Sequence, residues 1–225
     1  MTGSHGALSL TDLSSGGAIT LAPRRLVIAG YTARNQEAVR AHIAELAEIG
    51  VAPPPQVPMY YEIPSDLLTT ESAITVGGDQ TSGEVEPVLV NSGGRLYLGL
   101  GSDHTDRFVE KRDVAESKAS APKPMGDWVL PFDGVAAQWD DIEVTCRLDG
   151  EVYQQGALAA MLPPATLLDG LAEAGQALGP DSVMYCGTLP LLTGEFNYGD
   201  TYRLELRLPD GRSLSHSYDV KVRKH

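Results

Sequence analysis

Two glutamates flank a single valine in the segment "TSGEVEPVLV", residues 81–90, where the chain becomes apolar. On a strand, alternate side chains share a face, so Glu84 and Glu86 would point the same way. Strand geometry then places their bases roughly 6–7 Å apart. Two like charges at that spacing repel and raise each other's pKa unless a cation lies between them. A divalent cation is one explanation, and two solvated surface glutamates are the plain alternative.

The net charge of −13 argues against nucleic acids and anionic membrane surfaces as partners, because both are bound by basic patches. No stretch approaches the 18 apolar residues of a membrane span, and the N-terminus does not resemble a secretory signal. We therefore expect a cytoplasmic protein. Cys146 and Cys186 lie in apolar, strand-like surroundings, which favours buried thiols over a disulfide or a nucleophile.

The elements that must position the two glutamates are short apolar strands separated by turns. Asp149 and Gly150 predict a hairpin, because this dipeptide accepts a positive φ. A helix is expected from Gln36 to Ile49 with Asn35 as its N-cap, and a second helix over residues 163–179. Strands are expected at 18–23, 24–32, 59–63, 72–77, 84–90, 95–101, 142–148, 151–155, 182–187, 201–211 and 213–222.

Many short strands, two main helices and no alternating strand–helix order predict a mainly antiparallel α+β fold. A chain of 225 residues suits one substantial domain, alone or with a small appendage. We expect an N-terminal segment over residues 1–25, with a loose start and a first strand, followed by one domain over residues 26–225. The polar stretch 103–127 is expected to be a long loop, and such loops are commonly functional.

Several motifs in the same order resemble those of the fumarylacetoacetate hydrolase superfamily. The motifs run "AHIAEL", "GEVEPVLV", "GSDHTDRFVE", "ESKAS", "LDGEVYQQGALAAM", "GPDSVMYCGTLP" and "GDTYRLEL". They are similar to the family's His-x-x-Glu pair, Glu-x-Glu strand, Asp-x-Thr-x-Arg segment, Lys-Ser segment and later loops. The resemblance covers residues 26–222 and extends to a bacterial group of unassigned function near this superfamily. It implies a β-sandwich roll and makes residues 26–225 the catalytic domain.

This resemblance adds Asp103 to the two glutamates, because its spacing to Arg107 matches the family. Glu84, Glu86 and Asp103 would then converge on one ion from two neighbouring strands. Carboxylate-only ligands favour Mg²⁺ or Mn²⁺, with Ca²⁺ also suited, over zinc. About three octahedral positions would be left for water or for the paired oxygens of a 2-oxo acid or 1,3-dicarbonyl. Asp106 competes with Asp103 as a ligand on sequence alone.

His42 and Glu45 are three residues apart on the first expected helix and therefore share a face. In isolation the pair reads as polar residues on an exposed helix face. The resemblance implies a segment that folds over the metal, with Glu45 assisting His42 in activating water. His42 would then be a general base that titrates near its working pH.

Four further residues receive roles from the resemblance. Arg107 would bind a substrate carboxylate, and Lys118 would stabilise developing negative charge, with Lys123 as the rival for that role. Thr188 would offer its hydroxyl and backbone N–H to a substrate carboxylate, and Gln154 would offer its amide. Solvated surface positions are the plain alternative for these side chains.

Four features depart from the family's pattern and bear on the substrate more than on fold or metal. Ile63 replaces a lysine in "EIPS", and Pro87 directly follows Glu86. Glu110 stands where many members carry glutamine, and a Thr-Gly-Thr-Pro loop has become "CGTLP".

The resemblance implies a divalent-metal hydrolase that cleaves a C–C bond of an acylpyruvate-like oxo acid. Decarboxylation, hydration or isomerisation of a related 2-oxo acid through a metal-held enolate is a second interpretation. A non-catalytic oxo-acid-binding protein on the same scaffold is a third. The resemblance also implies a homodimer, which the sequence itself neither supports nor opposes.

Overall fold

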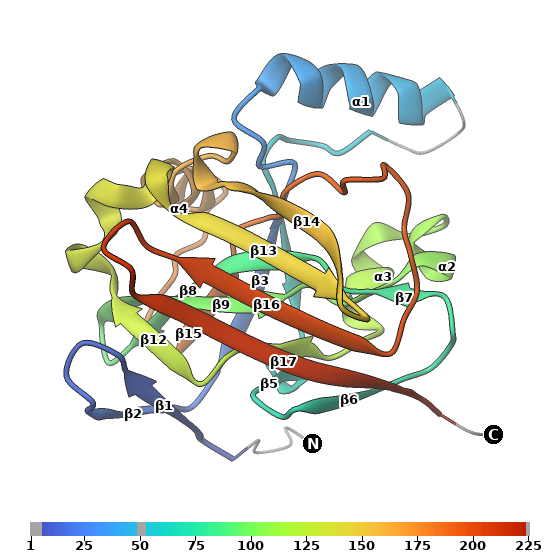
Figure 1. Cartoon of the computed structure of the whole chain (residues 1–225). Coiled ribbons are helices and arrows are strands. Elements are labelled where there is room, and N and C mark those ends of the chain that lie inside the picture. The colour runs from blue at the N-terminus through green and yellow to red at the C-terminus, as the bar shows by residue number, and fades with distance from the viewer. Residues whose placement is uncertain (1–5, 49–52, 224–225) are drawn as a thin grey trace.

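Two sheets form the body of the protein (Figure 1). The computed structural model describes residues 6–48 and 53–223. The larger sheet has eight strands in the order β2 (Ala18–Leu21), β1 (Leu8–Asp12), β12 (Trp128–Pro131), β9 (Arg95–Ser102), β8 (Val85–Ser92), β15 (Ser182–Tyr185), β3 (Arg25–Gly30) and β4 (Met59–Ile63). The smaller has five strands in the order β14 (Glu151–Ala157), β13 (Glu143–Leu148), β16 (Thr201–Arg207), β17 (Ser213–Val222) and β6 (Ala73–Val76).

Short strand pairs and helices surround these sheets. The pairs are β10 (Thr105–Asp106) with β7 (Thr81–Ser82), and β11 (Lys123–Pro124) with β5 (Leu68–Thr69). The α-helices are α1 (Gln36–Glu48), α2 (Arg107–Glu110), α3 (Val114–Ala119) and α4 (Pro164–Glu173). In Figure 1, α1 lies outside the two sheets, and α2 and α3 lie together beside β7.

Apolar side chains from both sheets meet in one core. Strands β9, β13 and β16 supply it with Leu98, Leu100, Val144, Cys146, Leu204 and Leu206, all of which are buried. A second cluster packs Leu167 and Leu171 of α4 against Leu89 of β8 and Met184 of β15. The central strands β8 and β15 are therefore held from α4, and β9 is held from the five-stranded sheet.

The predicted mainly antiparallel α+β fold is confirmed, and so are several local details. Asp149 and Gly150 adopt φ values of 50° and 94° between β13 and β14, as a tight hairpin requires. Asn35 caps α1 by accepting a hydrogen bond from Ala38 N at 3.1 Å. The expected end of this helix at Ile49 lies outside the described residues.

Two of the expected element boundaries differ from the structure. Residues 8–12 form β1, which pairs parallel with β12, whereas the first strand was expected only at residues 18–23. Helix α4 ends at Glu173 rather than at residue 179, because Gly175 turns to a left-handed φ of 74°. The division of the chain at residue 25 stays a prediction.

The polar stretch 103–127 is not a loop. It contains β10, α2, α3 and β11, and each short helix begins at an aspartate. Asp106 accepts hydrogen bonds from Phe108 N and Val109 N, while Asp113 accepts one from Glu116 N. These caps satisfy the free N–H groups of helices too short to be recognised by periodicity.

Both cysteines are free and buried, as predicted. Burial raises the pKa of the Cys146 thiol to about 12, which disfavours the reactive thiolate. None of the helices within residues 6–48 and 53–223 combines the length and apolar character needed to cross a membrane.

Gly101 lets β11 approach the strand end where the candidate site lies. In the β8–β9 register Gly101 stands opposite Glu86. A Cβ built on it would lie 2.7 Å from a ring carbon of Tyr185 and 2.8 Å from the carbonyl oxygen of Pro124. The Tyr185 hydroxyl donates to the Pro124 carbonyl at 3.0 Å, so neither neighbour moves freely.

We expect Gly101→Ala to lower the free energy of unfolding by about 1–3 kcal/mol through overpacking. Gly99→Ala is the control on the same strand, because a Cβ there meets no atom closer than 3.5 Å. That variant should be as stable as the parent chain. Urea unfolding midpoints measure both changes, and equal losses in the two variants would contradict the steric explanation.

Candidate functional site

The three predicted metal ligands lie together at one end of neighbouring strands. Glu84 immediately precedes β8 and Glu86 lies within it, while Asp103 directly follows β9. The backbone joins them, because Asp103 N donates to the Glu84 carbonyl at 3.0 Å. Asp103 is fully buried and Glu86 is 2% exposed. The rival ligand Asp106 is engaged as the N-cap of α2.

Two lysines surround Asp103. Lys118 of α3 forms an ion pair with Oδ2, and Lys123 of β11 lies 3.0 Å from Oδ1. Burial alone would raise the pKa of Asp103, but the two ammonium charges lower it below its ordinary value. Both predicted candidates for a charge-stabilising lysine therefore contact the same carboxylate. Lys123 is fully buried, whereas Lys118 retains slight exposure.

The Lys118 ammonium lies in the field of all three carboxylates. Burial would lower its pKa, but Asp103, then Glu84, then Glu86 act against this, and the net pKa is raised. In the described part of the chain, no three Asp, Glu, His or Cys side chains are arranged as ligands around one point. The acidic groups instead gather near a lysine ammonium.

Glu86 is held by backbone rather than by a lysine. Its Oε2 accepts a hydrogen bond from Gly187 N at 2.8 Å. Burial and then the nearby Asp103 charge raise the pKa of Glu86 well above its ordinary value. Gly187 has a φ of 94°, and a Cβ there would overlap the Thr32 hydroxyl, so glycine is needed for this approach.

Arg107 is tied into the same centre. Its guanidinium lies 2.9 Å from Glu84 and 2.8 Å from Glu110, and Nε donates to Ser82 Oγ at 2.7 Å. The Phe196 ring covers it, with the guanidinium carbon 3.8 Å from the ring centroid. A substrate carboxylate predicted to bind Arg107 would have to compete with two glutamates.

Gln154 and Thr188 fix the residue between the two glutamates. Gln154 Oε1 accepts from Val85 N at 3.0 Å, and Thr188 Oγ1 donates to the Val85 carbonyl at 2.8 Å. Gln154 Nε2 in turn donates to Thr188 Oγ1 at 2.8 Å and to the Leu189 carbonyl at 2.6 Å. The amide predicted to meet a substrate is therefore fully occupied within the chain.

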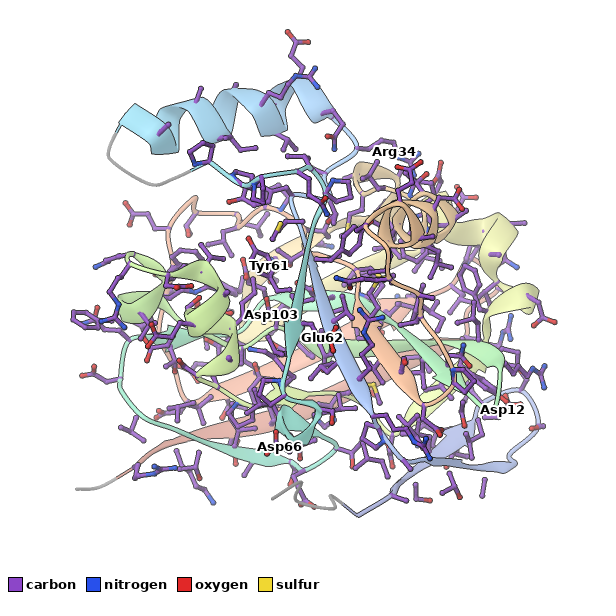
Figure 2. The ribbon with its side chains drawn as sticks, turned by 180° about the vertical axis from the view of Figure 1, so that it is seen from behind. Asp12, Arg34, Tyr61, Glu62, Asp66 and Asp103 are labelled. Carbon is purple, nitrogen blue, oxygen red and sulfur yellow. The ribbon has the colours of Figure 1, made fainter. Side chains whose placement is uncertain are left out.

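Two tyrosines near Lys118 were not predicted. Tyr61 of β4 places its ring centroid 5.9 Å from Lys118 Nζ, and its hydroxyl lies beside that of Tyr31. Figure 2 shows Tyr61 close to Asp103 in the middle of the molecule. Tyr31 has a φ of 58°, an unusual conformation for a bulky residue. Little in the sequence indicates that these tyrosines lie near the site: Tyr31 only follows the apolar strand β3, and Tyr61 lies within β4.

The predicted histidine–glutamate pair lies on one helix, and a further histidine, His104, directly follows Asp103 in the chain. His42 and Glu45 lie on α1, as expected, but their side chains are outside what the structure describes. His104 is buried, with its ring between Thr81 Oγ1 at 3.0 Å and Tyr218 Oη at 3.1 Å. Burial, followed by the Lys123 charge, lowers its pKa to about 3, so the ring is neutral.

We expect Gln154→Leu to lower the free energy of unfolding by about 1–3 kcal/mol, because Val85 N–H would lose its partner in a buried environment. The adjacent Gln155→Leu is the control, since Gln155 is exposed on the same strand and should change stability by less than about 0.5 kcal/mol. Denaturant unfolding measures both variants. Similar losses would show that the buried amide has no special structural role.

Solved structures with the same fold include a hydrolase and an isomerase. Fumarylpyruvate hydrolase from Pseudomonas aeruginosa, in complex with Mn²⁺ and pyruvate, matches with a TM-score of 0.67 and 17% identity over 97% of each chain. The 5-carboxymethyl-2-hydroxymuconate delta-isomerase from Mycobacterium smegmatis has a TM-score of 0.63 and 16% identity, covering 94% of this chain and 85% of that one. A yeast protein of the fumarylacetoacetate hydrolase family has a TM-score of 0.64 and 17% identity, covering 90% and 95%.

These matches confirm the predicted resemblance to the fumarylacetoacetate hydrolase superfamily at the level of the fold. Curated proteins provide no match. The family model described as "Protein of unknown function (DUF2848)" matches residues 29–218, which is most of the chain. The chain therefore belongs to the DUF2848 family.

Proposed function

We propose that the protein is a divalent-metal-dependent hydrolase that cleaves a C–C bond of an acylpyruvate-like oxo acid. The observation that carries this proposal is the gathering of Glu84, Glu86 and Asp103 around the Lys118 ammonium at the end of two neighbouring strands. The Mn²⁺–pyruvate complex of the P. aeruginosa hydrolase, which has the same fold, supports it.

The chemistry of the donors suits a hard cation, and the three carboxylates would have to turn toward one point to bind it. All three candidate ligands are carboxylates, which Mg²⁺ and Mn²⁺ prefer. Lys118 already places one positive charge among them. Glu86 is buried, and in the described part of the chain its hydrogen-bond donor is the backbone N–H of Gly187. A bound divalent ion would supply Lewis-acid polarisation of the substrate's 2-oxo and carboxylate oxygens.

Hydrolysis requires a water oxygen to bond to the distal carbonyl carbon of the substrate. The bond between that carbon and the methylene carbon then breaks, and its electron pair passes into the enolate of pyruvate, which takes up a proton at the same methylene carbon. We assign water activation to His42 with Glu45, which requires α1 to bring them to the site. Lys118 would balance the negative charge that develops on the enolate.

A second candidate uses the same residues without water attack. Decarboxylation or isomerisation of a related 2-oxo acid needs a stabilised enolate but no general base on α1. Both ring nitrogens of the buried His104 are engaged by Thr81 and Tyr218, so this histidine is not placed to activate water, which favours a reaction without water attack. The M. smegmatis isomerase shares the fold. Assays of acetylpyruvate, oxaloacetate and a 2-hydroxydienoate with Mn²⁺ separate these reactions by their products.

We expect Glu86→Gln to weaken Mn²⁺ binding by at least about 100-fold, because a ligand charge is lost while the side-chain shape is kept. Turnover of acetylpyruvate should fall with it. Calorimetric titration of Mn²⁺ and a pyruvate-release assay measure the two effects. The exposed Glu71→Gln removes the same charge away from the site and should change neither. Unchanged Mn²⁺ affinity in Glu86→Gln would exclude this residue as a ligand.

Lys118→Met should separate metal binding from turnover. Removing the ammonium takes away a competitor for the carboxylates, so Mn²⁺ should bind as tightly or more tightly. The turnover number should nevertheless fall by about 10²–10³-fold, because the charge on the enolate loses its partner. Lys111→Met, at an exposed position after α2, is the matched control. Retained turnover in Lys118→Met would contradict its catalytic assignment.

A further inference from the structure

Acidic and basic side chains are paired with one another in the site. The cations of the centre are Arg107, Lys118 and Lys123, and they face the carboxylates of Glu84, Glu86, Asp103 and Glu110. The cations of the site are therefore paired within the chain before any ligand enters.

Each of the three cations already has a carboxylate partner. Lys118 and Lys123 both contact Asp103. Arg107 is 3% exposed, lies between Glu84 and Glu110, and is covered by the ring of Phe196. Arginine can bind a carboxylate through two parallel hydrogen bonds only if one edge of its guanidinium is free. Here the two glutamates and Ser82 take up the donors on its edges.

Two tyrosines and Glu110 lie near Lys118. Tyr31 and Tyr61 stand there with adjacent hydroxyls, and both lie in the fields of Lys118 and Glu110. Burial raises the pKa of Tyr61 to about 12, so the phenol is neutral at physiological pH. A ligand that reaches beyond Lys118 would meet the hydroxyls and rings of these tyrosines. A second substrate carboxylate placed beside these tyrosines would be repelled by the like charge of Glu110.

We propose that the site selects 2-oxo acids that carry one carboxylate and an uncharged tail, and that Glu110 sets this preference against dicarboxylic oxo acids. This inference rests on the proposed function, because it assumes that an oxo acid binds at the three carboxylates. Glu110 acts in two ways: it repels a second carboxylate and it occupies Arg107 Nη1.

Two five-carbon acids test the preference without turnover. The acids 2-oxopentanoate and 2-oxoglutarate share their 2-oxo acid head and differ only in a terminal methyl or carboxylate. Neither is a 1,3-dicarbonyl, so calorimetric titration in saturating Mn²⁺ reports binding alone. The parent chain should bind 2-oxopentanoate at least about tenfold more tightly. In Glu110→Gln the ratio should fall to about one or reverse, because the repulsion is lost and Arg107 Nη1 keeps only a weaker hydrogen bond to a neutral amide oxygen.

Glu116→Gln is the matched control, because Glu116 is an exposed residue of α3 paired with Arg112. It should keep the parent ratio. A parent ratio near one, or an identical ratio in Glu110→Gln, overturns the inference even if acetylpyruvate is hydrolysed. The expected ratios without turnover of any oxo acid uphold the inference and overturn the proposed function. Failure of both acids to bind at millimolar concentration overturns both.

Discussion

The structure of the site depends on one buried carboxylate held by two lysines. Asp103 is fully buried, and an ionised group in that position is stable only with opposite charges beside it. Lys118 comes from α3 and Lys123 from β11, so this one residue draws two separate segments onto the end of β9. Removing either lysine from such a group leaves charge without a partner, which is a large cost in a protein interior. These two ion pairs therefore connect α3 and β11 to the end of β9.

The glutamates on β8 are positioned by a second set of contacts that reaches them through the backbone. Gln154 and Thr188 satisfy both polar groups of Val85, and this fixes the residue between Glu84 and Glu86. Because β14 supplies Gln154 from the five-stranded sheet, the relative position of the two sheets is transmitted to the carboxylates. The loop after β15 supplies Thr188. Small residues make these approaches feasible, as Gly187 shows where it donates to Glu86.

Local sequence patterns predicted much of the fold, but they did not predict the pairings between charged residues that are distant in the sequence. The hairpin at Asp149-Gly150 and the cap at Asn35 depend on neighbouring residues, and both were predicted. The helices after Asp106 and Asp113 span only one or two turns, so they are too short to show the helical spacing of apolar residues that would predict them. The gathering of Glu84, Glu86 and Asp103 followed from motif order. Their partners did not, because whether Arg107 meets a ligand or Glu110 is decided by side-chain geometry.

The cluster of acidic and basic groups at the end of β8 and β9 has a bearing on the purpose of the site. A buried ionic group adds little stability compared with apolar residues of similar volume, so a chain folded for stability alone has no need of it. Here several acidic and basic groups share one strand end, and Glu86 is kept in a setting that opposes its ionised form. Groups perturbed in this way by burial and a specific charge are typical of functional sites. The same reasoning applies to Arg107: with Glu84 on one side and Glu110 on the other, it holds the predicted metal ligand Glu84 in place.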